Sequence, residues 1–157
     1  MDATVFALRG SFQQYFHQFR KINKTRTILC LEYLFGSKNN FTGNIPSFIC
    51  ELRSINILDL SNNNFSGSIP LCMGNLRSNL PESVFENLRS LDVGHNQLAG
   101  KLPRSLIHFS NLEVLNVESN RINDTFPFWL SSLQNCKFLS YAPTHSMDPY
   151  VKPRSLR

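Results

Sequence analysis

The sequence lacks several features that would assign it quickly to a functional class. No stretch approaches 18 uninterrupted apolar residues, so we expect no transmembrane segment in this chain. The four cysteines, at positions 30, 50, 72 and 136, form no C-x-x-C pair, which argues against zinc. The four histidines share no common position and imply no serine or aspartate partner. The sequence therefore predicts no enzyme, no metal site and no cofactor.

The net charge of +5 is confined to the two ends of the chain. Residues 1–28 hold five basic residues and one acidic residue, and residues 137–157 hold four and one. The middle, residues 29–136, has seven basic and nine acidic residues. A nucleic-acid-binding surface would carry its lysines and arginines on the folded body itself. We therefore expect no nucleic-acid partner.

Four segments in the middle of the chain repeat one pattern of apolar residues, an asparagine and a proline. The asparagine stands at positions 39, 63, 96 and 120 and the proline at 46, 70, 103 and 127. Both residues therefore recur with the same steps of 24, 33 and 24. With the leucines upstream, each copy follows L-x-x-L-x-L-x-x-N, the pattern of a leucine-rich repeat. The shared period predicts a solenoid of stacked repeats.

Each part of the repeat has a structural task. The L-x-L alternation predicts a short strand with leucines pointing inward and intervening residues pointing to solvent. The fold class expected is α/β: a horseshoe segment of a leucine-rich-repeat solenoid, with a short parallel sheet on the concave face and 3-10 or short helices opposite. Where the chain leaves the strand, a buried amide can satisfy both backbone donors and acceptors. The expected ladder of such amides consists of Asn39, Asn63, Asn96 and Asn120.

The long step between Asn63 and Asn96 departs from the period. It falls well short of two full periods, so more than half of one repeat is missing there. The interval keeps the Leu-Pro and helical half of a repeat but has no L-x-L-x-x-N half. We expect a partial repeat at 76–87 that has lost its strand, with a kink or loosening of the stack at 76–86.

The repeats occupy residues 28–139, about four in number, and leave two flanks. Residues 1–27 form a basic and aromatic segment in which Phe12, Tyr15, Phe16 and Phe19 recur at helical spacing. A helix that caps the open end of the first repeat is favoured over an amphipathic membrane-surface helix or a targeting segment. Residues 140–157 contain three prolines and are expected to be a disordered basic tail.

Three segments, Leu58–Pro70, Ser90–Leu98 and Leu112–Leu130, carry more detail than the general repeat. They resemble the plant-specific 24-residue class, and closely the ectodomains of plant receptor-like proteins, over roughly residues 28–135. The resemblance implies a non-catalytic scaffold that binds a protein or peptide, signals through a co-receptor kinase in defence or development, and is located at the plasma membrane or outside the cell.

The ends of the chain differ from that family plan. Val5–Leu8 is too short for the apolar core of a secretory signal, and Arg9 follows it at once. Without a signal peptide or membrane anchor, the chain resembles a truncated or fragmentary member. Two other functions stay open. Plant inhibitors of microbial polygalacturonases resemble the same repeat, which suggests a soluble inhibitor, and a non-functional receptor fragment is the third hypothesis.

The solvent-facing strand positions on the concave side are the natural ligand surface of a solenoid. The plainer interpretation of any single position is an ordinary solvated strand face, because few residues dominate an interface. The candidate ligand-binding residues are Tyr33, Phe35, Asn56, Asp59, Asn62, Arg89, Asp92, His95, Glu113, Asn116 and Glu118.

Two kinds of covalent modification are also indicated. Asn40, Asn64 and Asn123 begin N-x-[ST] sequons after a strand and would accept glycans in an exported chain; otherwise their hydroxyl residues serve the turn. Cys50 and Cys72 fall in the helical halves of adjacent repeats, where they either form a disulfide or remain buried thiols. Their offsets within the repeat differ by two residues, which slightly favours the thiols.

Overall fold

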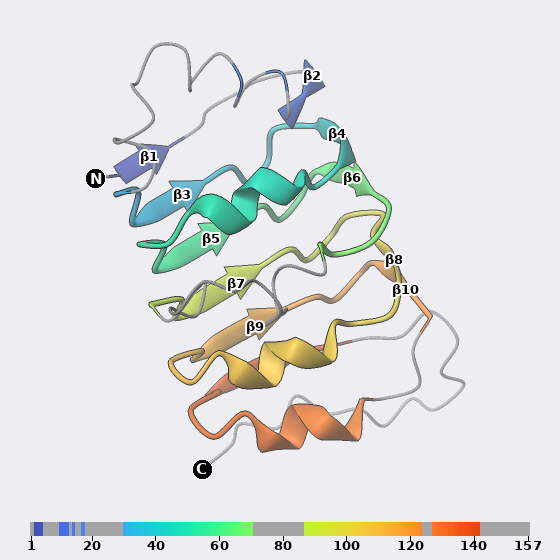
Figure 1. Ribbon diagram of the computed structural model, residues 1–157. Helices are drawn as coiled ribbons and strands as arrows, with labels where there is room; N and C mark the ends of the chain where they lie inside the picture. The colour runs from blue at the N-terminus through green and yellow to red at the C-terminus, as the bar shows by residue number, and fades with distance from the viewer. Residues whose placement is uncertain are drawn as a thin grey trace.

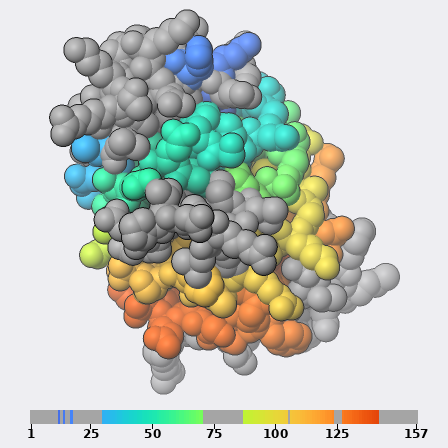
Figure 2. All heavy atoms as spheres, in the orientation of Figure 1, coloured from blue at the N-terminus to red at the C-terminus, as the bar shows by residue number. Residues whose placement is uncertain are grey.

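The chain winds into stacked coils, each of which adds one strand to a long parallel sheet (Figure 1). The computed structural model describes residues 2–4, 10–12, 14, 17, 30–70, 87–123 and 127–141. In a space-filling view the coils follow one another in chain order from one end of the molecule to the other (Figure 2). This arrangement is the leucine-rich-repeat solenoid that the repeat pattern predicts, so the expected fold class is confirmed.

The main sheet has six parallel strands in the order β1-β3-β5-β7-β9-β11. Its strands are parallel because each coil returns to the start of the sheet by way of the opposite side. In-register pairing places the middle residues of all the strands opposite one another. The bounds are β1 (Asp2–Thr4), β3 (Tyr33–Phe35), β5 (Ile57–Asp59), β7 (Ser90–Asp92), β9 (Val114–Asn116) and β11 (Phe138–Ser140).

A second set of strands follows at the next side of each coil. These strands form two groups, which are joined by two backbone hydrogen bonds. Gln97 N–H donates to the Phe65 carbonyl at 2.8 Å, and Ala99 N–H donates to the Gly67 carbonyl at 2.7 Å. One group has three strands and the other has two: β2 (Gly10–Ser11), β4 (Phe41–Asn44) and β6 (Asn64–Ser66), then β8 (Ala99–Gly100) and β10 (Arg121–Ile122).

Within the described residues, three 3-10 helices carry the chain back along the side opposite the main sheet (Figure 1). They are η1 (Ser47–Glu51), η2 (Arg104–His108) and η3 (Phe128–Ser132). A proline with extended backbone precedes each of them, and its fixed φ leads the chain into the helical turn. The 3-10 helices expected from the repeat are therefore confirmed.

The core consists of columns in which each apolar position of the repeat stacks on its counterpart. Leu58, Leu91 and Leu115 are fully buried and stand opposite one another in adjacent strands, as the sequence predicts. Phe41, Phe65, Leu98 and Ile122 form a second buried column behind the sheet. No coil is thick enough to bury its own leucines, so the columns join the coils into one core.

Asn96 shows how polar groups are accommodated beside these columns. Its Oδ1 accepts the Phe65 N–H of the preceding coil at 3.0 Å. Its Nδ2 donates to the Leu60 carbonyl of that coil at 3.0 Å, and to the carbonyls of Val93 and Gly94 in its own coil, both at 3.1 Å. The one amide therefore satisfies backbone groups of two coils at a point where neither has a strand partner.

Asn63 and Asn120 repeat this bonding. Asn63 Oδ1 accepts the Phe41 N–H at 2.9 Å, and Asn120 Oδ1 accepts the Leu98 N–H at 3.0 Å. Each Nδ2 also donates to a carbonyl of the preceding coil, at 2.8 and 2.9 Å. Asn39 donates within its own coil. The four asparagines thus occupy one structural position, and Asn39, Asn96 and Asn120 are at most 8% exposed.

The turn that directs each asparagine inward needs a left-handed residue immediately before it. Lys38, Asn62, His95 and Ser119 have φ values of 58°, 54°, 53° and 52°. Such backbone is uncommon outside glycine and persists only where the surroundings hold it in place. Its recurrence at one position in four coils indicates that the amide hydrogen bonds outweigh the local strain.

The main sheet is continuous across the long step between Asn63 and Asn96. β5 pairs directly with β7, with Leu58 opposite Leu91, and the sheet runs on without a skipped position. The strands on either side of the long step are therefore neighbours joined by one longer coil. The additional length of that coil falls within 71–86, outside the described residues. The partial repeat at 76–87 itself stays a prediction.

The N-terminal segment supplies two strands that were not anticipated. β1 pairs with β3, with Ala3 opposite Leu34, and β2 pairs with β4. Phe12 is fully buried and meets Phe41 edge-on at 5.0 Å and Phe65 at 5.4 Å between ring centroids. The segment therefore covers the core of the first complete repeat.

The pattern conceals these two strands because Ala3 replaces the strand leucine. Leu8 also stands where the repeat has its asparagine. Tyr15, Phe16 and Phe19 lie outside the described residues, so the capping helix stays a prediction. At the other end β11 keeps the register of the repeat, with Leu139 opposite Leu115, and residues 142–157 are not among those described.

The ladder predicts that Asn96→Ala destabilises the protein far more than the loss of an ordinary surface amide. Backbone donors and acceptors of two coils would lose their partner, at a cost of about 2–4 kcal/mol. Urea unfolding followed by circular dichroism measures the difference. Asn123→Ala, at an exposed position, is the control and should change stability by less than about 0.5 kcal/mol. Equal losses in the two variants would contradict the ladder's role.

The inward and outward alternation in β9 predicts a second contrast. Leu115→Ala opens a cavity in a fully buried column and should cost about 2–5 kcal/mol. Val114→Ala removes a half-exposed side chain from the next position and should cost less than about 1 kcal/mol. Thermal unfolding of the two variants measures this difference, and the reverse order would show that the strand register is misassigned.

Candidate functional site

The outward side chains of the main sheet form the candidate site, which we call the concave face. In β3, β5, β7 and β9 a buried residue stands between two half-exposed ones. Because the strands pair in register, the half-exposed residues form two rows across the sheet. The first row is Tyr33, Ile57, Ser90, Val114 and Phe138, and the second row is Phe35, Asp59, Asp92, Asn116 and Ser140.

The second row ends the strands with a repeated local turn. Asp59 Oδ1 accepts the Ser61 N–H at 3.0 Å and the Ser61 hydroxyl at 2.7 Å. Asp92 Oδ1 accepts the Gly94 N–H at 2.9 Å. In the next coil, Asn116 Oδ1 accepts a backbone N–H two residues on, at 3.1 Å. A short oxygen-bearing side chain at this position therefore holds each strand end.

Asp92 is a carboxyl of this face whose environment perturbs its pKa. Burial raises its pKa above the usual value, against the lowering effect of hydrogen bonds from Gly94 and the Asn116 amide, and repulsion from Asp59 adds to the rise. Gly94 leaves the room that this amide needs, because a Cβ there would lie 2.7 Å from Asn116 Nδ2.

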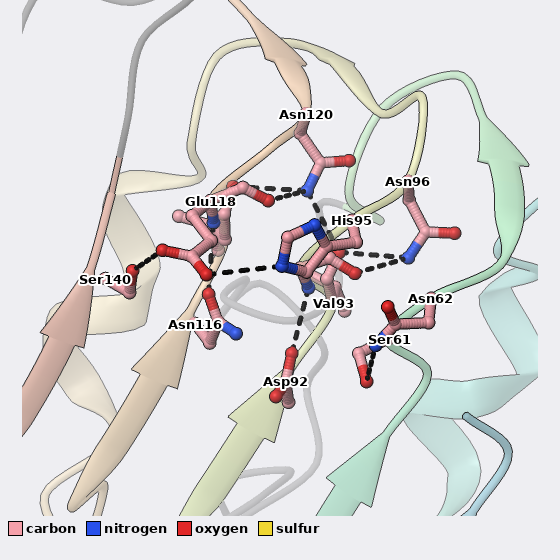
Figure 3. A network of polar contacts seen from close by, with 12 residues as sticks. Ser61, Asn62, Asp92, Val93, His95, Asn96, Asn116, Glu118, Asn120 and Ser140 are labelled. Atoms are coloured by element: carbon pink, nitrogen blue, oxygen red, sulfur yellow. Dashed lines mark hydrogen bonds and ion pairs between the residues drawn. The ribbon is translucent and has the colours of Figure 1, made fainter. Parts of the chain in front are cut away.

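A chain of polar contacts crosses the ends of β7, β9 and β11 (Figure 3). His95 Nε2 lies 3.3 Å from Glu118 Oε1, and the other oxygen of Glu118 accepts the Ser140 hydroxyl. Glu118 accordingly lies between groups from the two neighbouring coils, and all three side chains are on the concave face. The serine hydroxyl faces the carboxylate and not the imidazole, so the group is not a nucleophile with its base.

An ion-pair cluster lies at the opposite ends of the same strands. Glu113 accepts a hydrogen bond from Lys137 Nζ at 2.7 Å, and Arg89 Nη1 lies 3.6 Å from its second oxygen. The Lys137 hydrogen bond and charge, followed by the Arg89 charge, lower the pKa of Glu113. All three side chains are accessible to solvent, so the cluster contributes surface charge more than stability.

Aromatic and aliphatic side chains occupy much of the remaining surface. The rings of Tyr33 and Phe35 lie parallel on β3, 6.5 Å apart with an interplanar angle of 4°. Ile57 and Val114 continue the first row half-exposed, and Phe138 on β11 is 48% exposed. Half-exposed apolar residues beside charged ones are typical of a surface that binds another molecule.

The structure places the predicted ligand-binding residues on the strands of this face or next to those strands, in three groups. Tyr33, Phe35, Asp59, Asp92 and Asn116 stand on the strands. Asn56, Arg89 and Glu113 lie just before strands, and Asn62, His95 and Glu118 lie just after them. Asn56 and Asn62 donate to Ser54 and Ser61 in their own coil. A ligand role for any of them stays a prediction.

Three residues of the concave face were missed in the sequence. Phe138 and Ser140 lie in β11 and extend the two rows, and Lys137 precedes β11 and pairs with Glu113. The repeat pattern weakens after Leu133, which concealed them. The offset of one repeat from Glu113, Val114 and Asn116 would have located all three.

The sequons and cysteines lie away from the strand rows. Asn40 and Asn123 are exposed, whereas the Asn64 amide oxygen accepts a hydrogen bond from Gln97.

Cys50 is disulfide-bonded, so the slight preference for a free thiol there is wrong. Cys30 and Cys136 are free, and Cys72, the partner named from the sequence, lies outside the described residues. The Cys50–Cys72 pairing stays a prediction. Among the described residues, no helix is both long and apolar enough to cross a bilayer.

Comparison with known proteins agrees with this geometry. The leucine-rich repeat family matches residues 54–76, 87–109 and 111–133, and the unmatched interval 77–86 falls in the longer coil. The chain is 66% identical over 121 residues to Receptor-like protein 35 of Arabidopsis thaliana, an alignment that covers 68% of this chain and 13% of that protein. The chain therefore spans about an eighth of the length of this relative.

Solved structures show the same coil geometry. The Arabidopsis receptor kinase HAESA, in complex with the peptide hormone IDA and the co-receptor SERK1, matches with a TM-score of 0.69 and 29% identity, over 90% of this chain and 21% of that chain. The plant peptide hormone receptor RGFR1, in complex with RGF2, matches with a TM-score of 0.64 and 25% identity, over 86% and 18%. From its repeats, its fold and these relatives, the chain is a segment of leucine-rich repeats similar to those of plant receptor-like proteins.

Proposed function

We propose that this chain is a non-catalytic recognition segment of a plant receptor-like protein, which binds a protein or peptide ligand on its concave face. The observation that carries the proposal is the in-register display of half-exposed aromatic, aliphatic and charged side chains across five strands. Receptors of similar fold, HAESA and RGFR1, have been solved with peptide hormones. The relatives are receptor-like proteins, so the inhibitor hypothesis is not favoured.

A co-receptor kinase is the second proposed partner. The HAESA complex contains the co-receptor SERK1 besides its hormone, and HAESA matches this chain over 90% of its length. A receptor-like protein that recognises a ligand would then signal through such a kinase, in defence or in development. Ligand binding and co-receptor binding need separate surfaces, and the solenoid offers its concave face and the side formed by β4, β6, β8 and β10.

The proposed location is the plasma membrane or the extracellular space. A disulfide at Cys50 is typical of proteins that fold in an oxidising compartment. Asn40 and Asn123 are exposed sequon asparagines, which supports their role as glycan acceptors, and Asn64 is the third proposed acceptor.

The concave face predicts that binding depends on the sheet and not on the helical side. Dodecapeptides selected from a random display library on the immobilised chain should bind at least about tenfold more weakly to Val114→Arg. That variant places a long cation in the middle of the first row. Phe128→Arg, at an 80% exposed position of η3, is the matched control and should bind as the unsubstituted chain does. A selection without binders above a blank surface would refute the proposed function.

The sequon geometry predicts a glycan at Asn40. The chain, secreted from plant cells behind an added export signal, should lose mass on treatment with peptide N-glycosidase. Thr42→Val should remove the Asn40 share of that mass, because it destroys the sequon and leaves the asparagine in place. Mass spectrometry of the tryptic peptide measures occupancy. An unmodified Asn40 peptide from the unsubstituted, secreted chain would contradict the assignment.

A further inference from the structure

One part of the concave face combines an aromatic ring with two carboxylates on successive strands. Phe35 stands opposite Asp59, and Asp59 stands opposite Asp92, so the three residues form one end of the second row. Neighbouring strands lie roughly 4.8 Å apart, which brings the two carboxylates close together. All three side chains are half-exposed and can reach a molecule lying across the strands.

The negative charges of Asp59 and Asp92 are not required by the fold. The turn at the end of each strand needs only a side-chain oxygen, and Asn116 supplies that oxygen in the next coil. Its Oδ1 accepts a backbone N–H at 3.1 Å, against 3.0 Å for Asp59 and 2.9 Å for Asp92. A neutral amide therefore builds the same turn, and the charge at the other two positions must be explained otherwise.

Neither carboxylate has a cationic partner among the residues that the structure describes. The ion pairs there involve Glu113 and Glu118, and the hydrogen-bond partners of Asp59 and Asp92 are neutral. His95 lowers the pKa of Asp92 only as the smallest of several effects, while burial and the Asp59 charge raise it. Two adjacent like charges, one of them partly desolvated, would be stabilised by a cation from outside the chain.

The neighbouring side chains indicate what kind of cation fits. The parallel rings of Tyr33 and Phe35 present flat aromatic surface beside Asp59. Ile57 lies in the first row between Tyr33 and Ser90 and adds an aliphatic surface. An aromatic face with adjacent carboxylates suits a guanidinium or an alkylammonium group, whose planar or methylene part packs on the ring while its N–H groups donate to oxygen.

We propose that the Phe35–Asp59–Asp92 end of the second row binds an arginine or lysine side chain of an extended peptide lying across the strands. The first row, with Tyr33 and Ile57, takes an apolar side chain of the same peptide beside the basic one. The inference rests on the proposed function, because it names the chemistry of the ligand that the concave face recognises. Both carboxylates also disfavour acidic ligands, which sets the charge preference of the site.

The test uses the dodecapeptides selected on the full 157-residue chain. Selected peptides should be enriched in arginine or lysine next to an apolar residue. Replacing that arginine by citrulline, or that lysine by norleucine, removes the charge and should weaken binding at least about tenfold. In the D59N/D92N chain each new asparagine supplies the oxygen of its turn as Asn116 does, so both turns should be preserved. That chain should bind the charged and neutral peptides equally weakly. Isothermal titration calorimetry measures all four combinations.

Glu51→Gln is the matched control, because it removes one exposed negative charge from η1 and should leave binding unchanged. Peptides that bind through Val114 but lack a basic residue would overturn the inference and leave the proposed function standing. A D59N/D92N chain that still distinguishes arginine from citrulline would also overturn it. Should that chain fail to fold, the citrulline comparison on the unsubstituted chain decides alone. Binding of the neutral oligosaccharide cellohexaose, lost in D59N/D92N, would assign the face to a sugar instead.

Discussion

The amide of one asparagine per coil is the interaction on which the rest of this structure depends. A coil must turn out of its strand inside the molecule, where backbone donors and acceptors have neither strand partners nor water. Asn96 resolves this with an oxygen that accepts from the preceding coil and a nitrogen that donates to both coils. Each such buried group would cost roughly 1–3 kcal/mol if left unpaired, which is comparable to what burial of one leucine contributes, so the apolar columns and the ladder need each other.

This division of tasks leaves the outward positions free to vary. The inward leucines and the asparagines hold the backbone in place, while the concave rows tolerate tyrosine, isoleucine, serine, valine and phenylalanine at one equivalent site. Asp92 and Asn116 show the same freedom in a position that still has a structural duty, because either residue supplies the oxygen of the turn. Substitutions on this face can therefore change what it binds without altering the fold.

The longer coil shows how tolerant the stack is away from the sheet. Leu58 and Leu91 pair in the same register as Leu91 and Leu115, although the first two are further apart in the chain. Register depends on the strand and the asparagine, both of which are kept on each side of the insertion, and extra length is absorbed elsewhere in the coil.

The repeat pattern alone determined the fold class, the inward column of leucines, the four ladder asparagines and the face on which ligand candidates lie. These features follow from periodicity, because residues at equal offsets occupy equal positions in every coil. Only the tertiary structure decided that Glu118 meets His95 and Ser140, that Phe12 packs on Phe41 and Phe65, and that Asp59 and Asp92 lie side by side without a cation among the described residues. Such contacts depend on which coils become neighbours and on how each side chain turns. The pattern reveals neither the neighbouring coils nor the side-chain directions where a coil is longer than the period or where a copy of the repeat is degenerate, as at residues 2–11.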